Sequence, residues 1–341
     1  MTNPDEPARP TLYAVYDLGR APVTFDVLHF YALAHVWTER SGFAGYHMVF
    51  VLGDGDGFRH LTPKDNALDR EQKMWRLRHI HLQHASISRR CLGVSFFERR
   101  ADLANLLRAV HPKQMFPPNY TVEKPNHAFM LHQLFGMNPT GAENHVFEPT
   151  PAALRNVDEW LANRTDGKPP VVMTLRTSKA EPKRNSQIEE WIAAARHMQD
   201  RGFAPVVMCD TDVTLAGLDT KLFEDLPVFG IGGLDVELRL AMYRRAYLNF
   251  ADNGGPPLLN FFMPDSKLLL FLPVEKLPEV ARQGGLPRMA QLLGVEPYGD
   301  FPMATPVCRF VWRPDNRDII IEEFEKTVAL IGEPPAAGAA Q

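Results

Sequence analysis

The sequence contains few cysteines, and this shortage excludes one class of site. Only three cysteines occur among its 341 residues. Cys91, Cys209 and Cys308 are widely separated, and no Cys-x-x-Cys pair is present, so the spacing excludes a zinc-ribbon type of site. The pattern favours a reduced intracellular compartment, and we predict a cytoplasmic protein.

The sequence also has little net charge and no long apolar run. The formal net charge is -4 at pH 7, whereas a general nucleic-acid binder needs a basic face, so we expect no nucleic-acid partner. The longest apolar stretch, Leu268 to Val274, is as short as a buried strand and predicts no transmembrane segment. The polar segment Met1 to Pro10 lacks the apolar core of a signal peptide. Membrane contact is therefore expected only as peripheral association through partners.

Several well-known catalytic motifs are absent. There is no Gly-x-Gly-x-x-Gly, no Gly-x-x-x-x-Gly-Lys-Ser/Thr, no Gly-x-Ser-x-Gly and no His-Glu-x-x-His. These absences count against dinucleotide, P-loop, serine-hydrolase and zincin functions. His79, His81 and His84 are close in sequence, but His-x-His on a helix puts the two rings on different faces. We therefore interpret the three histidines as surface or core residues and predict no metal site.

Alternating strands and helices are what the sequence does contain. The composition, 45% hydrophobic and 23% charged, is that of a globular protein, and the length suits two α/β domains. We predict a Rossmann-like domain at 1–150, a second at 165–332 and a disordered Pro/Ala-rich tail at 333–341. Strands are expected at 12–16, 46–52, 93–97, 171–175, 205–209, 228–231, 246–250 and 267–271, and helices at 25–40, 69–88, 101–110, 152–163, 186–201, 235–245, 257–262 and 317–331.

The first candidate site follows the strand that ends in Thr174-Leu175-Arg176. Ligands of open parallel sheets bind beyond the carboxyl ends of the strands, and an arginine there can hold a phosphate with two parallel hydrogen bonds. Ser186 could cap the next helix. An alternative interpretation is a solvated basic loop. The polar residues predicted to bind phosphate with Arg176 are Ser178, Lys183 and Arg184, with Lys179 a weaker candidate.

Two more strand ends carry candidate donor-binding residues. Asp210 follows the strand 205–209 and could bind a ribose, although a turn or helix cap is an equal alternative. The turn Asp252-Asn253-Gly254-Gly255-Pro256 presents bare backbone amides, which suit a diphosphate, and Pro257 could begin a helix there. We predict that Asp210, Asp252, Asn253, Gly254 and Gly255 contact the donor.

The first half offers candidates for a base and for an acceptor site. Asp17, at the end of the first strand, and Asp26, near the start of the first helix, could each act as a general base. Asp26 could equally be an acid that stabilises the helix N-terminus. The acceptor-side candidates are Gly19, Arg20, Glu98 and Arg99, with Arg100 beside them.

The second half, about residues 165 to 332, resembles the C-terminal domain of a bacterial GT-B glycosyltransferase, closest to the fucosyltransferase-like branch that uses GDP-sugars. The resemblance rests on Arg176, Asp210, the turn 252–256 and the segment Trp312-Arg313-Pro314-Asp315. It implies two Rossmann-like domains facing a central cleft. It also implies metal-independent transfer from a GDP-sugar to a glycan or protein acceptor, with the nucleotide-sugar as co-substrate and no other cofactor. The paired arginines of that branch are not reproduced, since Leu175 and Thr177 flank a lone Arg176.

Two other functions are compatible with the same fold. One is a nucleotide-sugar epimerase, which needs acid and base groups near the sugar but no acceptor groove. The other is a non-catalytic glycan- or partner-binding protein of glycosyltransferase descent, which the missing second arginine favours. Fold alone does not separate these functions.

Overall fold

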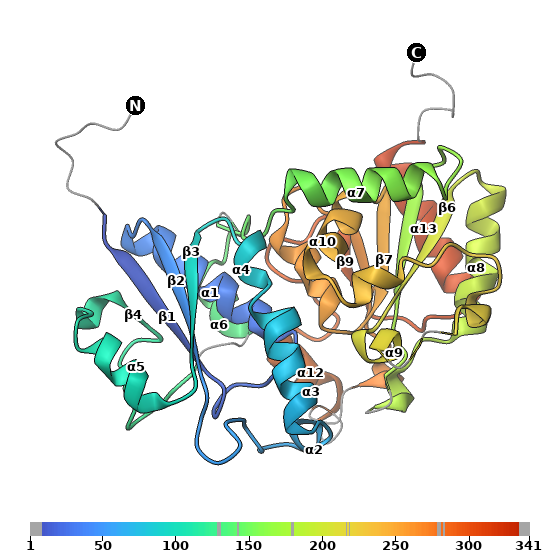
Figure 1. The fold of residues 1–341 in the computed structure, drawn as a ribbon. Coiled ribbons are helices and arrows are strands. Elements are labelled where there is room, and N and C mark those ends of the chain that lie inside the picture. Colours follow the sequence, from blue (N-terminus) through green and yellow to red (C-terminus); the bar gives the residue numbers. More distant parts are fainter. Residues whose placement is uncertain are drawn as a thin grey trace. The chain divides into compact units, whose positions relative to one another are not determined.

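The computed structural model describes residues 9–127, 131–141, 143–178, 181–215, 217, 219–277, 281 and 284–333. The chain divides into two compact units, Met1–Phe147 and Glu148–Gln341 (Figure 1). Of the predicted disordered tail, residues 334–341 lie outside the described residues.

The first unit is built on a parallel sheet with the strand order β3-β2-β1-β4. Helix α1 packs on one face and α5 on the other, where Leu103 joins the core beside Val49 and Val51. The strands predicted at 12–16, 46–52 and 93–97 are thus confirmed, while β4 and α6 fall where the pattern is weak. The elements are β1 (Thr11–Asp17), α1 (Val27–Ser41), β2 (Gly45–Val51), α2 (Pro63–Asn66), α3 (Arg70–Arg76), α4 (His84–Ile87), β3 (Cys91–Phe97), α5 (Arg100–Leu107), β4 (Met115–Phe116) and α6 (Leu131–Met137).

The helix predicted over 69–88 is interrupted by a π-helical turn, Leu77–His81. This turn puts His81 in the core against the rings of Tyr16 and Phe50, and His84 is also fully buried. His79 stacks on Trp75 with 4.6 Å between ring centroids. The three histidines are therefore packing residues.

Three buried histidines make the stability of the first unit depend on pH. Burial lowers the pKa of His35 and of His84 to about 4, and it lowers the pKa of His81 well below its usual value. In the unfolded chain these imidazoles take up protons below about pH 6.5. The folded state therefore loses stability as the pH falls from there towards about 4. We expect His35 and His84 each to cost about 2 kcal/mol between about pH 7.5 and about pH 5, measured by urea denaturation.

His81→Phe is the matched variant, because a phenyl ring keeps the edge-to-face contact with Tyr16 and cannot titrate. In this variant the stability difference between the two pH values should become smaller. An unchanged difference would contradict a neutral, buried His81.

The second unit is a five-stranded parallel sheet in the order β6-β5-β7-β8-β9. Helices α8 and α13 cover one face, where the fully buried Trp191 packs edge-on against Phe250 and Phe271. Helices α7 and α10 pack together on the other face (Figure 1). The elements are α7 (Pro151–Ala162), β5 (Pro170–Leu175), α8 (Ile188–Asp200), β6 (Ala204–Cys209), α9 (Thr211–Leu215), α10 (Val236–Arg245), β7 (Leu248–Asp252), β8 (Leu268–Phe271), α12 (Gly285–Leu293), β9 (Cys308–Val311) and α13 (Arg317–Ile331).

One predicted element of this unit was wrong. The segment 228–231 is not a strand, because Val228 makes one bridge to Val207 and a 3-10 helix, Gly230–Gly233, follows at once. The short helix predicted at 257–262 is present as a 3-10 helix, Pro256–Phe262, with both prolines in its first turn, where the backbone N–H groups have no partner within a helix. Strand β9 and helices α9 and α12 are short and were not predicted.

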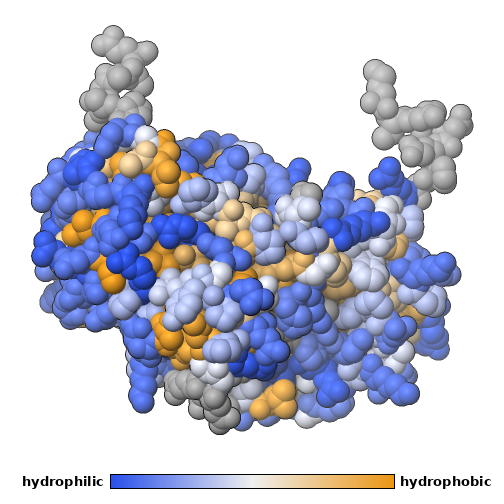
Figure 2. All heavy atoms as spheres, turned by 180° about the vertical axis from the view of Figure 1, so that it is seen from behind, coloured by the Kyte–Doolittle hydropathy of each residue, from blue (hydrophilic) through white to orange (hydrophobic). Residues whose placement is uncertain are grey.

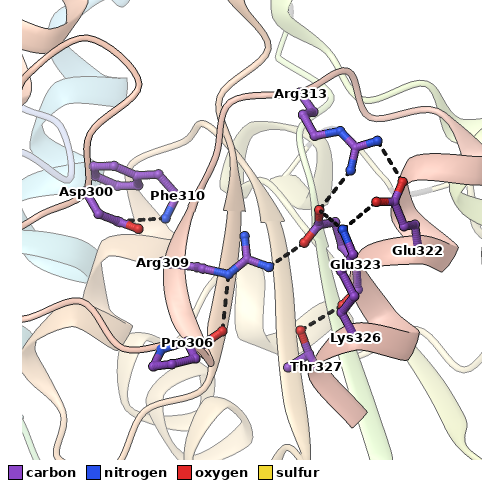
Figure 3. A network of polar contacts seen from close by, with 9 residues as sticks. All are labelled: Asp300, Pro306, Arg309, Phe310, Arg313, Glu322, Glu323, Lys326 and Thr327. Atoms are coloured by element: carbon purple, nitrogen blue, oxygen red, sulfur yellow. Dashed lines mark hydrogen bonds and ion pairs between the residues drawn. The ribbon is translucent and has the colours of Figure 1, made fainter. Parts of the chain in front are cut away.

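A network of ion pairs fixes the segment after β9 onto α13 (Figure 3). The carboxylate of Glu323 is nearly buried, and both Arg309 and Arg313 donate to it. Arg313 also reaches Glu322 at 2.7 Å. Because Arg313 is anchored in this way, the position of Asp315, two residues later, is set as well.

The view in Figure 2 shows a mostly hydrophilic surface with apolar residues in separate patches. Large apolar side chains that are strongly exposed are few among the described residues, and they come from different elements, such as Leu61, Leu92 and Leu330. No helix in the described part of the chain has both the length and the apolar character needed to cross a membrane.

Candidate functional site

Three adjacent strands bring the predicted donor-binding residues of the second unit together. Strand β5 lies between β6 and β7, so all three carboxyl ends meet at one edge of the sheet. The backbone N–H of Thr177 donates to Asp210 Oδ2 at 3.1 Å, which joins the ends of β5 and β6. Arg184 Nη2 donates to the carbonyl oxygen of Asn253 at 2.8 Å, which joins the loop after β5 to the turn after β7. The sequence-predicted residues thus form one cluster.

A second arginine lies beside Arg176. The short 3-10 helix Pro182–Arg184 brings Arg184 back to the end of β5. There Arg176 is 8% exposed and Arg184 is 9% exposed. Glu181 Oε2 accepts from Arg184 Nη1 at 2.6 Å and lies 3.6 Å from Arg176 Nη2. The sequence has no two adjacent arginines at this strand end, but the fold brings the guanidinium groups of Arg176 and Arg184 close together.

These two arginines have unused hydrogen-bonding capacity. The Nε atoms of Arg176 and Arg184 are buried and have no hydrogen-bond partner among the described residues. Burial, followed by the nearby charge of Arg176, lowers the pKa of Arg184. A buried donor without an acceptor costs about 1–3 kcal/mol, and anion oxygens would relieve that cost. The carboxylate of Glu181 lies against both guanidinium groups.

The glycines after β7 have no conformational reason to be glycine. A Cβ added to Gly254 would come no closer than 3.6 Å to its nearest neighbour, Asp252 O, which is ordinary contact. Gly255 has φ -72° and ψ -47°, a conformation open to any residue. Glycine is also used where a backbone must come close to a ligand, and that use fits this turn.

The remaining predicted donor residues are placed differently. Lys183 is exposed on the 3-10 helix, and Ser178 is buried with its carbonyl oxygen accepting from Asn185. Lys179 lies outside the described residues. Ser186 does not cap α8, whose first helical residue is Ile188, and instead its hydroxyl donates to Asp252. Asp252 is 2% exposed, and its carboxyl accepts this hydrogen bond.

In the first unit, Asp17 is fully buried and completely engaged. Arg100 donates to both carboxylate oxygens at 3.1 and 2.9 Å, and Tyr120 donates to Oδ2 at 2.8 Å. The backbone N–H of Gly19 donates to Oδ1 at 3.0 Å. The geometry therefore favours a structural role, tying the end of β1 to α5 and to the segment after β4.

Asp26 is less constrained. It is half-buried immediately before α1, and its carboxylate makes no capping bond to the helix. Thr24 Oγ1 donates to Asp26 Oδ2 at 2.6 Å. Of the two predicted bases, Asp26 is the one that is partly exposed.

A cavity of about 620 Å³ opens at the carboxyl edge of the first sheet. Gly19 and Arg20, predicted on the acceptor side, line it. Arg100 lines it too, whereas Glu98 and Arg99 are exposed outside it and Arg99 pairs with Asp102. The sequence does not show which of Arg99 and Arg100 faces the cavity, because this depends on the rotation of the first turn of α5 about its axis. The other lining residues are Asp54, Phe58, Ala101, Val122, Glu123 and Pro125.

Both units together have the two-sheet α/β fold of GT-B glycosyltransferases. No protein-family model matches the chain, and no curated protein sequence matches it. Among solved structures, the ADP-heptose LPS heptosyltransferase II of E. coli has a TM-score of 0.53 over 94% of this chain and 99% of that chain, at 9% identity. A glycosyl transferase of family 9 from Veillonella parvula has a TM-score of 0.49 over 77% and 80%, at 10% identity.

These comparisons correct the predicted resemblance in two respects. The likeness is not confined to the C-terminal half, since it covers 94% of the chain. The fucosyltransferase-like branch and its GDP donor are not supported. Arabidopsis thaliana FUT1 in complex with GDP has a TM-score of 0.25 at 8% identity, over 70% of this chain and 53% of that chain. The prediction of two Rossmann-like α/β units is confirmed.

Proposed function

We propose that this protein is a glycosyltransferase that takes a sugar from a nucleoside-diphosphate donor, without a metal ion. The observation that carries the proposal is the pair of buried arginines, Arg176 and Arg184, converging at the carboxyl edge of the second sheet. The leaving diphosphate carries most of the charge that develops in the transition state of glycosyl transfer. Guanidinium groups held in place before reaction stabilise that charge most effectively.

The donor diphosphate would lie between these arginines and the turn at Gly254 and Gly255. Its oxygens would take the place of the Glu181 carboxylate and accept from the backbone amides of the turn. The heptosyltransferase that shares the fold uses ADP-heptose, as its name states. ADP-sugars therefore stand beside GDP-sugars as the first donors to test.

In the first unit, the cavity beside Arg20 and Arg100 suits the acceptor. Phe58, Val122 and Pro125 provide an apolar surface for a sugar ring, and the arginines provide polar contacts at its edge. Asp26 is the proposed base that removes the proton of the attacking hydroxyl. The acceptor would be a glycan, or a protein that carries one.

Isothermal titration calorimetry with ADP, GDP, UDP and dTDP tests the donor site directly, and one of them should bind in the micromolar range (about -8 kcal/mol). If none of the four binds, the proposal fails.

Gly254→Ala probes the same site without touching a side chain. The added methyl makes only ordinary contacts, so the melting temperature should stay unchanged, while affinity for the bound diphosphate falls about 10-fold or more because the methyl group blocks its approach. Gly136→Ala is the matched control for affinity, because nothing lies within 4 Å of that added methyl and affinity should be unchanged. Gly136 lies in α6, so the melting temperature of this control should stay the same or rise. Unchanged affinity in Gly254→Ala would remove this turn from the donor site.

A further inference from the structure

A buried carboxyl pair lies directly beneath the proposed diphosphate site. Asp252 ends β7, and Asp315 comes from the segment between β9 and α13. Both carboxyls are almost completely removed from solvent, with Asp252 2% and Asp315 0% exposed. They are within hydrogen-bonding reach of each other. Two carboxyls at this distance cannot both be ionised at low energetic cost, so they share their protons unequally.

The surroundings decide which of the two carries the negative charge. Lys276 Nζ donates to Asp315 at 2.6 Å, and Trp191 Nε1 donates at 3.2 Å. The backbone and side-chain N–H groups of Gln187 both donate at 3.2 Å. Burial alone would raise the pKa of Asp315, but these donors and the charge of Lys276 hold it below its usual value. Asp315 is therefore the ionised partner.

Asp252 has a different environment. The hydroxyl of Ser186 donates to Oδ2, and no donor contacts Oδ1 among the described residues. Burial, and then the charge of Asp315, raise the pKa of Asp252 to about 8. At neutral pH Asp252 therefore holds the proton and can donate it towards Asp315.

Ser186 connects this pair to the arginine site. Its Oγ accepts the backbone N–H of Arg176 at 2.8 Å, and its own N–H donates to the carbonyl oxygen of Arg176 at 2.9 Å. Lys276 also donates to the carbonyl oxygen of Asn185 at 2.9 Å. The backbone of Arg176 is thus held from below by a chain of buried hydrogen bonds that begins at the two carboxyls.

We propose that Asp252 is a positioning residue which, through Ser186 and with Asp315 as its partner, holds the strand end at Arg176 and the turn at Gly254 in the geometry that binds the donor diphosphate. This inference rests on the proposed function of that site. Asp252 does not touch the donor. It acts by keeping the ends of β5 and β7 joined.

Loss of the Asp252 proton would put two negative charges side by side, whereas the cation Lys276 donates to Asp315. The other charged groups near this point are Arg176 and Arg184 on the β5 side, whose contacts in the described structure are with Glu181 and Asn253. Repulsion between the two carboxylates would move the end of β7 away from the segment that carries Asp315 and so disturb the Ser186 contact that holds the backbone of Arg176. Donor affinity should therefore fall as the pH rises through about 8.

Asp252→Asn separates this role from general structural importance. The asparagine oxygen can accept from Ser186 and its amide can donate to Asp315, so the variant reproduces the protonated carboxyl and cannot ionise. Calorimetry with ADP and with GDP, from about pH 7.5 to about pH 9.5, should show wild-type affinity falling about 10-fold. Asp252→Asn should match the wild type within about 3-fold at the lower pH and stay flat. Ser186→Ala should bind about 10-fold more weakly throughout the range, because it removes the connecting hydroxyl.

Two outcomes would overturn the inference: the same pH dependence in Asp252→Asn as in the wild type, or wild-type affinity in Ser186→Ala. If no nucleotide binds at all, the proposed function fails, and the positioning role is then judged by two other measurements. The infrared band of a protonated carboxylic acid should be present at about pH 7 in the wild type and missing in Asp252→Asn. Hydrogen exchange at the Arg176 amide should speed up above about pH 8 relative to Asp252→Asn. Absence of both differences would also overturn it.

Discussion

Replacing Arg176 or Arg184 with alanine is expected to weaken binding of the nucleoside diphosphate about 10- to 100-fold. A charge-assisted hydrogen bond to a phosphate contributes about 1.5–3 kcal/mol, and each guanidinium provides at least one. Arg184→Lys should recover little of the lost affinity, because a lysine cannot form two parallel bonds while also holding the carbonyl oxygen of Asn253. Calorimetry at neutral pH measures all three variants.

Lys183→Ala is the matched control for the arginine variants. Lys183 lies on the same 3-10 helix as Arg184 but is exposed, so solvent screens its charge and affinity should change less than about 3-fold. Wild-type binding by both arginine variants, with melting temperatures unchanged, would refute the donor site. A loss of affinity in Lys183→Ala as large as in Arg184→Ala would show that net charge alone is responsible.

Replacing Asp26 with asparagine is expected to slow sugar transfer about 100- to 10,000-fold, the usual contribution of a general base. Affinity for the donor nucleotide should be unchanged, because Asp26 belongs to the first unit and the arginines to the second. Release of the nucleoside diphosphate from the donor, with water or an added sugar as acceptor, provides the rate. A wild-type rate in Asp26→Asn would exclude Asp26 as the base.

Asp17→Asn, unlike Asp26→Asn, is expected to change the stability of the first unit rather than the chemical step of sugar transfer. The substitution leaves Arg100, whose side chain is 18% exposed, without its buried partner, and breaking such a pair costs about 3–5 kcal/mol. Urea denaturation should therefore show a destabilised first unit. If Asp17→Asn instead keeps its stability and loses transfer, Asp17 is the base and the structural interpretation of its hydrogen bonds is wrong.

The sequence predicted where the proposed donor-binding cluster lies, but it did not show which side chains meet there. Arg176, Asp210 and the turn at Gly254 could be found because each follows a strongly apolar strand, and the ends of parallel strands share one edge. The sequence indicates Arg184 only as part of a basic loop. The residues around it do not show that its side chain lies beside Arg176. Asp315 was noticed only as the end of the segment Trp312 to Asp315, and Lys276 gave no signal, because their importance depends on contacts with a strand end more than 20 residues away along the chain.

The sequence by itself determined the alternation of strands and helices, and with it the two parallel sheets and the strand ends that carry the candidate site residues. Hydrophobic periodicity is a local property, so it can be read without knowing which strands are neighbours. The tertiary structure decided that β5 lies between β6 and β7, that Arg184 meets Arg176, and that Asp17 is buried under Arg100 and Tyr120. Those pairings depend on how helices pack across the sheets, and this packing is fixed by contacts between residues far apart in the chain.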